Sequence, residues 1–568
     1  MESILKKING LANTRIIRVI FINVIIFIIA NIVFSIKYEE VDDFIIYNLY
    51  SGLDGTYTIY GIYIYPLICF VIGGFFKILP MINWHTIFLL SMQFICFTII
   101  GNILLKKDEN KFSYILYILF ASVFYATLLQ LIQYTSVAAL LIATSFFMIM
   151  NGIEQEEKSK KYKILYFVLF TIGIMIRMQS LLIVVPFFAI YLGYQCILKI
   201  KNAISKEKLR NILKQYLILV GITILVYGSN YLVYHTNDVY REYMEYNDVR
   251  VILQDLSFTD YESNKEIFDE IGWSKNDYYL FYTYNYGDEN IYSKENLQKI
   301  LDYKESKNKY YRLNTDVENI LECLKKQMIE ENLCITILFL VVTVTAIITN
   351  RNQRGYIIAL FLVTICVNVI FIILNRNILR VVIPEYILGS AMMLYLIIYS
   401  KKKTTKRYIF LKIICVLLLV GSSIFSGSFY HKGYDRNNYK NYRNLIQYTN
   451  SHKENVYLYT SPSMQCRYLV YSVYEMPPQA AFSNLRVMGG WDIFSKNYYD
   501  FKERYHLEGT FLDLLKDNVY LIDRNMKWMD MYYRDYIIQS IKEHYHKEVT
   551  CEKIEEFDDV YIYKLKEK

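Results

Sequence analysis

The chain has 568 residues, of which 54% are hydrophobic and 20% are charged, and its net charge is +8. Its apolar residues form blocks of about 20, long enough to cross roughly 30 Å of hydrocarbon. A soluble globular protein is therefore excluded. The basic residues cluster in short segments between blocks, which predicts membrane orientation rather than nucleic-acid binding. The nine cysteines form no CxxC pair, so neither a zinc site nor a disulfide framework is predicted.

The first apolar block, Ile16–Ile36, follows a basic start over residues 1–18. Residues 35–38 make a poor cleavage site, so we expect an uncleaved first span with a cytoplasmic N-terminus. The stretch that follows this span is then outside the membrane. Four carboxylates lie close together there: Glu39, Glu40, Asp42 and Asp43.

The next apolar segment, Tyr60–Pro80, contains Pro66 and the pair Gly73-Gly74. If this segment crossed the membrane, the basic clusters of all later loops would lie outside, against the positive-inside rule. Proline and paired glycines also suit a broken helix at the interface. We therefore expect a re-entrant or surface helix within an external loop, residues 37–83.

With that choice the chain has about eleven spans, its N-terminus inside and its C-terminus outside. A polar, Tyr-rich segment, residues 235–331, is predicted to be a large external loop. The predicted spans are about Ile16–Ile36, Trp84–Leu105, Phe112–Ile132, Tyr134–Met150, Tyr162–Ile176, Leu181–Leu198, Gln215–Tyr234, Leu333–Thr349, Tyr356–Leu374, Leu379–Ser400 and Tyr408–Phe429.

The remaining segment, residues 430–568, predicts a small extracytoplasmic α/β domain beside the transmembrane domain, residues 1–429. The fold class is thus an α-helical polytopic membrane protein with a soluble C-terminal domain. Predicted strands are Val456–Thr460, Val519–Asp523 and Val560–Lys564, and predicted helices are Tyr439–Asn450, Tyr498–His506, Thr510–Leu515 and Met529–His546.

The carboxylates after the first span are the leading catalytic candidates. Asp42 or Asp43 could take a proton from an acceptor hydroxyl, while a neighbouring carboxylate orients that acceptor. The alternative is that this acidic stretch is only the solvated end of the span. No HExxH, P-loop or GxSxG motif has a supporting context, so no metal ligands are predicted.

Three arginines are candidates for binding a lipid phosphate. Arg376 and Arg380 lie at the predicted outer end of a span, where a guanidinium can grip a phosphate through two hydrogen bonds, or simply reach toward lipid headgroups. Arg177 lies with Gln179 in a tight external turn, facing a cavity or forming a structural ion pair.

The string Met488-Gly489-Gly490-Trp491-Asp492 is the most distinctive in the C-terminal domain. An aromatic ring beside a carboxylate can hold a sugar face and its hydroxyls, whereas the alternative is a tight turn with a packed Trp. The residues predicted to bind substrate are Glu39, Glu40, Tyr65, His85, Gln179, Trp491 and Asp492.

The first span, the external motif Glu39-Glu40-Val41-Asp42-Asp43, a Tyr/Gly-rich segment and a Pro-bearing interfacial helix resemble the start of GT-C glycosyltransferases. That superfamily includes protein O-mannosyltransferases and lipid A aminoarabinose transferases. The resemblance implies a sugar donor linked to polyprenyl phosphate, used on the outer face of a bacterial cytoplasmic membrane. It also implies that the acid or base comes from the first external loop, which matches Asp42 or Asp43.

Arg380, followed by Pro384, is similar to a basic residue that contacts the carrier phosphate in related enzymes. Many relatives carry another acidic residue in the turn after the third span, but residues 130–136 here (QLIQYTS) contain none. No cofactor is therefore predicted, and participation of a divalent cation stays open.

The leading hypothesis is an inverting glycosyltransferase that acts on a cell-envelope glycan, lipid or polymer in contact with the bilayer. The alternative is a transporter or flippase for envelope lipids or polysaccharide, although no repeated halves with matching broken helices are visible. A scaffold or sensor is a third hypothesis, and it leaves the acidic stretch unexplained.

Overall fold

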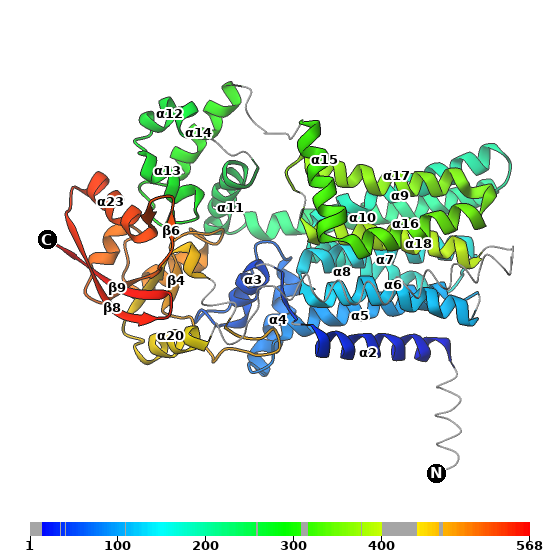
Figure 1. Ribbon diagram of the computed structural model, residues 1–568, viewed down its shortest axis with the longest axis horizontal. Helices are drawn as coiled ribbons and strands as arrows, with labels where there is room; N and C mark the ends of the chain where they lie inside the picture. The colour runs from blue at the N-terminus through cyan, green and yellow to red at the C-terminus, as the bar shows by residue number, and fades with distance from the viewer. Residues whose placement is uncertain are drawn as a thin grey trace, which may run out of the picture.

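The computed structural model describes residues 14–34, 36–39, 41–107, 109–256, 260–307, 316–376, 378–399, 440–464 and 470–568. The chain is mostly helical, with a helical bundle at one end and a part that contains a small sheet at the other (Figure 1). Two predictions, the span Tyr408–Phe429 and the substrate-binding Glu40, lie outside the described residues.

Eight of the ten spans predicted within the described ranges are helices long and apolar enough to cross a membrane. The other two, α8 (Lys160–Ile176) and α16 (Leu333–Thr349), have 17 residues each, and α16 meets the helical segment before it at 95°. The eight spans are built from α2 (Arg15–Val33), α5 (Trp84–Leu104), α6 (Lys111–Gln130), α7 (Tyr134–Glu154), η1 with α9 (Met178–Ser180, Leu181–Ile200), α10 (Lys206–His235), η5 with α17 (Arg351–Gln353, Arg354–Ile373) and α18 (Leu379–Tyr399).

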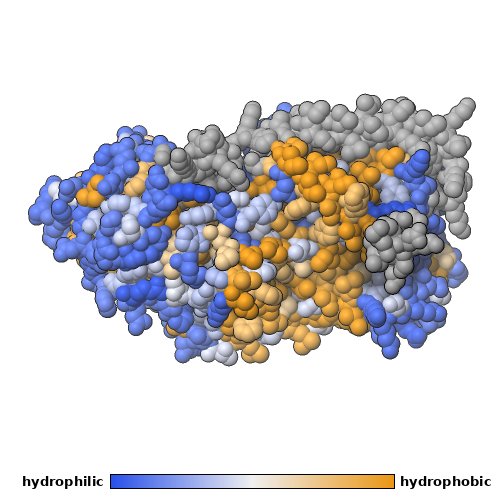
Figure 2. Space-filling view, turned by 90° about the horizontal axis from the view of Figure 1, so that it is seen from below, coloured by the Kyte–Doolittle hydropathy of each residue, from blue (hydrophilic) through white to orange (hydrophobic). Residues whose placement is uncertain are grey.

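The bundle exposes a band of apolar side chains between two hydrophilic ends (Figure 2). Large exposed side chains include Ile32, Leu217 and Leu225, whereas α7 and α18 are almost wholly buried at its centre. Water penalises such a band and lipid does not, so this is a membrane-associated protein.

The basic segments between helices meet at the bundle end far from the small sheet. Lys106 pairs with Glu157 (3.2 Å), Lys208 pairs with Glu154 (2.9 Å), and Lys107 donates to a main-chain carbonyl at the end of α18. The acidic stretch and the C-terminal residues lie at the other end, which we call the site end (Figure 1).

The Pro66-bearing segment forms one short helix at the site end, α4 (Pro66–Ile78). Its 13 residues span about 20 Å, less than the hydrocarbon thickness. It packs on α3 (Val41–Ser51), where a Cβ at Gly73 would lie 3.1 Å from the Tyr50 carbonyl oxygen. The length of α4 agrees with the expected surface or re-entrant helix.

The C-terminal residues form a five-stranded sheet in the order β4-β3-β5-β9-β8. β3 pairs in parallel with β4 and β5, whereas β9 pairs antiparallel with β5 and β8. The three predicted strands are present, and the prediction missed β4 and β8. The strands are β3 (Val456–Tyr459), β4 (Leu485–Val487), β5 (Val519–Arg524), β8 (Val549–Phe557) and β9 (Val560–Glu567), and the helices are α20 (Lys440–Ser451), α22 (Lys496–Tyr505), η8 (Phe511–Leu515) and α23 (Tyr533–Tyr545).

The described part of residues 235–307 is mostly helical and shares a hydrophobic core with this sheet. Phe281, Tyr292 and Leu297 pack in the same cluster as Phe511 and Leu521. The two segments therefore form one structural unit at the site end. The helices of the first segment are α11 (Asp238–Val251), α12 (Lys265–Glu270), α13 (Lys275–Tyr282) and α14 (Lys294–Ser306). The later α15 (Val317–Lys325) and η4 (Lys326–Glu331) pack against the bundle instead (Figure 1).

Candidate functional site

A short parallel strand pair fixes the acidic stretch at the site end. β1 (Lys37–Tyr38) pairs with β2 (Leu131–Ile132), and the Glu39 N–H donates to the Ile132 carbonyl (3.0 Å). Helix α3 begins directly after this pair, so Asp42 and Asp43 occupy its first turn, where helix N-H dipoles favour negative charge. The exit of α2 is thus tied to the turn before α7.

Asp42 lies where three separate parts of the chain meet. Its Oδ2 is 3.9 Å from Nη2 of Arg380, and its Oδ1 accepts a hydrogen bond from the Trp491 indole N–H (3.3 Å). The side chains of Asp42 and Arg380 are 25% and 18% exposed, so a ligand can still reach both. The hydroxyl of Ser136, a residue of α7, donates a hydrogen bond to the main-chain oxygen of Arg380 (3.1 Å) and so holds this part of the chain in place.

Asp43 points the other way, into the protein, and is fully buried. Its Oδ1 accepts the Tyr134 N–H (3.1 Å) and shares a hydrogen bond with Nε2 of His85 (3.0 Å), while Nδ1 of His85 pairs with the Tyr50 hydroxyl. This network joins α3, α5 and α7. Asp43 is therefore placed to position α3 rather than to meet a substrate.

His85, one of the residues predicted to bind substrate, lies at the site end and is fully buried. The Asn83 side chain caps α5 by accepting the Thr86 N–H (3.1 Å), which places His85 in the first turn of the helix. There it faces Asp43 and Tyr50 instead of solvent.

Burial also keeps the phenol groups of Tyr38 and Tyr50 neutral. It raises the pKa of the Tyr38 and Tyr50 hydroxyls well above their ordinary value. Tyr38 pairs with the Thr86 hydroxyl (2.6 Å) and accepts from the Asn83 amide (3.1 Å). Both tyrosines thus serve as neutral hydrogen-bonding groups in the buried network around Asp43 and His85.

Arg177 is connected to Asp42 through the aromatic rings of Tyr63 and Trp491. It donates to the Tyr134 hydroxyl (3.1 Å), and its guanidinium lies 4.7 Å from the centre of the Tyr63 ring. Tyr63 packs edge-on against Trp491 with ring centres 5.0 Å apart. Sequence reasoning missed Tyr63 and Tyr134, whose only signal was their place among many other tyrosines.

The Gly-Gly-Trp string forms a tight turn against the protein's own backbone. A Cβ at Gly489 would lie 2.1 Å from the Tyr284 carbonyl oxygen, and the Tyr286 hydroxyl donates to the Gly490 carbonyl (2.7 Å). The glycines thus allow helices of residues 235–331 to approach, and the turn aims Trp491 at Asp42.

The other predicted residues make their contacts away from Asp42. Arg376 lies in the turn before α18, and Gln179 is exposed in η1. Tyr65 directly precedes α4, and its hydroxyl donates to Ser229 of α10 (2.9 Å). Glu39 continues the β1–β2 pairing, and Asp492 pairs with Arg486 (2.9 Å). The structure therefore groups Asp42, Arg380 and Trp491, with Arg177 nearby.

A buried carboxyl on α18 was also missed. Glu385 accepts from the Asn368 amide of α17, and Gln327 of η4 donates to the Asn368 oxygen (2.6 Å). An acidic residue inside an apolar span is itself a signal of a polar contact within the bundle.

In the described part of the chain, no group of three or more His, Cys, Asp and Glu side chains is placed to hold a metal ion. Asp42 and Arg380 together can accept a proton from a hydroxyl and stabilise an anionic leaving group in one place. No protein-family model and no curated protein matches the sequence.

Proposed function

We propose that this protein is a membrane glycosyltransferase of the GT-C kind, which moves a sugar from a polyprenyl-phosphate carrier to a hydroxyl of a cell-envelope acceptor. The resemblance of the first external loop to that superfamily supports the proposal, as does the apolar band, which suits a lipid-borne donor. The site end would face the outside of a bacterial cytoplasmic membrane, and the basic end would face the cytoplasm.

The observation that carries the proposal is the 3.9 Å contact between Asp42 and Arg380 at the site end of the bundle. The two residues are far apart in the sequence, and each follows or begins an apolar helix. Their partial exposure suits groups that exchange their mutual contact for contacts with ligands.

In the proposed reaction, the Asp42 carboxylate removes the proton of the acceptor hydroxyl. That oxygen then attacks the anomeric carbon of the donor sugar. The bond between this carbon and the phosphate oxygen breaks, and polyprenyl phosphate leaves with the electron pair. Arg380 binds the phosphate and stabilises its developing charge, while Arg177 adds positive charge nearby. Direct displacement inverts the configuration at the anomeric carbon.

The geometry favours Asp42 over Asp43 as the base. Asp43 is fully buried and bonded to His85 and to the Tyr134 N–H, so an acceptor would have to displace part of the α3 packing to reach it. Asp42 needs no such change. The Trp491 N–H holds its carboxylate in place.

The test uses the full chain in lipid nanodiscs and a panel of polyprenyl-phosphate-linked hexoses and pentoses. The released polyprenyl phosphate and the anomeric configuration of the product are measured. Asp42→Asn should lower release by roughly 10²–10⁴-fold. Arg380→Leu should lower it by roughly 10²–10³-fold, and Arg380→Lys by less.

Asp238→Asn is the matched control, because Asp238 is an exposed carboxylate at the start of α11. It should retain wild-type release. Wild-type release by both Asp42→Asn and Arg380→Leu would contradict the mechanism. Vectorial movement of lipid-linked sugar across the bilayer with no transfer would favour the transporter.

A further inference from the structure

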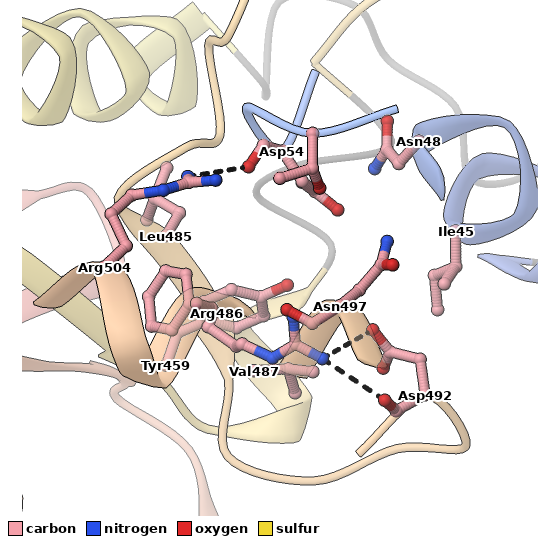
Figure 3. A pocket seen from close by; sticks show the side chains of 12 residues that line it. Ile45, Asn48, Asp54, Tyr459, Leu485, Arg486, Val487, Asp492, Asn497 and Arg504 are labelled. Carbon is pink, nitrogen blue, oxygen red and sulfur yellow. Dashed lines mark hydrogen bonds and ion pairs between the residues drawn. The ribbon is translucent and has the colours of Figure 1, made fainter. Parts of the chain in front are cut away.

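A pocket lies between α3, with the turn after it, and the C-terminal sheet (Figure 3). Its one wall is α3 and the turn after it, and its other wall is β4 with α22. The space between them is narrow: the part that a water molecule can enter is only about 20 Å³, room for one or two waters. We call it the Asn48 pocket, after the residue on its α3 wall.

Two amides on facing walls of this pocket are buried and lack partners. Among the described residues, none pairs with Oδ1 of Asn48 or with Nδ2 of Asn497. The two side chains are only 1% and 7% exposed, and Figure 3 shows both projecting into the same space. Burying an amide without a hydrogen bond is unfavourable, so each of these atoms needs a partner: a water molecule, or a ligand hydroxyl that takes the place of that water.

The charges of the lining balance one another. Arg486 binds the Asp492 carboxylate (2.9 Å), and Arg504 donates to the main-chain oxygen of Asp54 (3.2 Å). The lining thus contains two arginines and two aspartates. Such a lining offers little net attraction to a phosphate or a carboxylate. The ligand that fits is therefore uncharged.

The same lining offers apolar area next to the amides. Ile45 and Phe501 line the pocket together with Asn48 and Asn497. Hydroxyl groups that donate and accept, next to C–H surface, are the chemistry of a sugar ring. Because the interior is narrow, the edge of such a ring suits it better than a wide flat ligand.

We propose that the Asn48 pocket takes up hydroxyl groups at the edge of a neutral saccharide unit of the acceptor, while the rest of the ring lies at the pocket mouth, an inference that rests on the proposed function. Asn48 follows Asp42 by six residues on α3, a rise of about 9 Å that an oligosaccharide can bridge. Trp491 contacts Asp42 while the next residue, Asp492, lines the pocket, so one turn joins the two sites. The acceptor is then a neutral glycan rather than a teichoic-acid-like polyanion.

The experiment measures saccharide binding to the full chain in nanodiscs by isothermal titration calorimetry, without glycoside detergents. The probes are maltose, cellobiose, lactose and N,N′-diacetylchitobiose, with glucose 6-phosphate and inorganic phosphate as charged comparators. Asn48→Leu and Asn497→Leu should each weaken binding of the preferred disaccharide by about tenfold or more. An alanine variant replaces any leucine variant whose thermal midpoint falls below that of wild type.

Asn518→Leu, at an exposed asparagine before β5, is the matched control and should bind like wild type. Asp42→Asn should also keep disaccharide binding. If the wild-type protein binds the disaccharide but transfers no sugar from any donor, the proposed function is refuted and the pocket still stands. The inference is overturned if wild type binds no disaccharide, if both pocket variants bind like wild type, or if a charged comparator binds more tightly.

Discussion

The indole N–H of Trp491 donates to the carboxylate of Asp42 across 449 positions of sequence. Through this contact the C-terminal residues that form the sheet, together with the loops around it (the C-terminal unit), reach the proposed catalytic group in the segment that follows α2. The same unit accepts hydrogen bonds from Asn83 and Thr86 at the main-chain oxygen of Val473 (3.0 and 2.8 Å). The C-terminal unit is therefore part of the site rather than a separate appendage.

Trp491→Phe keeps an aromatic ring against Tyr63 but removes the hydrogen bond to Asp42. A hydrogen bond to a charged group contributes roughly 1.5–3 kcal/mol when it is shielded from water. Because Asp42 is partly exposed, we expect the lower end of this range, which corresponds to about tenfold slower transfer. Release of polyprenyl phosphate by the variant measures it. Trp528→Phe, at an exposed tryptophan, should transfer at the wild-type rate, and an unchanged rate in Trp491→Phe would show that the contact is incidental.

Asp43→Asn should lower stability more than it lowers chemistry, because Asp43 is a fully buried hydrogen-bond acceptor. The expected loss is about 1–3 kcal/mol, seen as a lower midpoint of thermal unfolding followed by tryptophan fluorescence. Asp42→Asn should leave that midpoint close to wild type.

A double-mutant cycle separates a network from two independent contacts. Asp43→Asn combined with His85→Leu should cost less than the two single losses together, with a coupling of roughly 0.5–3 kcal/mol. Additive losses would mean that the hydrogen bond between Asp43 and His85 does not hold α3 to α5.

The grouping of Asp42 with Arg380 could be anticipated from sequence, because both residues adjoin apolar spans that the loop charges orient the same way. The burial of His85 could not, since it depends on how Asn83 caps α5. Strand β8 was missed because its residues (VTCEKIEEF) are mostly exposed at a sheet edge and lack apolar alternation. The three-residue strand β4 gives too short a pattern to read.

The polar contact within the bundle predicts a difference between two substitutions of Glu385. Glu385→Gln keeps a side-chain oxygen that accepts the hydrogen bond from the Asn368 amide. Glu385→Leu removes this acceptor, so the buried Asn368 amide loses its hydrogen bond and its contact with Gln327 must rearrange. We expect a stability loss of about 1–3 kcal/mol for the leucine variant and a much smaller one for the glutamine variant. Thermal unfolding in the same nanodiscs compares them, and equal losses would show that the carboxyl charge matters rather than its hydrogen bond.

The C-terminal sheet should respond to pH through Asp523. Burial raises the pKa of this carboxyl from 3.8 to about 6, despite hydrogen bonds from Thr460 and the nearby Arg534. The folded state therefore binds the proton more tightly than the unfolded state. The stabilisation from Asp523 is complete below pH 3.8 and is lost as pH rises through about 6. The full loss is about 3 kcal/mol, and roughly half of it falls between pH 5 and 8.

Asp523→Asn removes this titration, so its local stability relative to wild type should rise between pH 5 and 8. Hydrogen–deuterium exchange of β5 and β9 peptides in the full chain, corrected for intrinsic exchange rates, measures the local opening free energy. Asp530→Asn, at an exposed carboxylate in the same domain, should show no such change. A variant-minus-wild-type difference that falls or stays flat with pH would mean that Asp523 is ionised throughout this range, held so by Arg534.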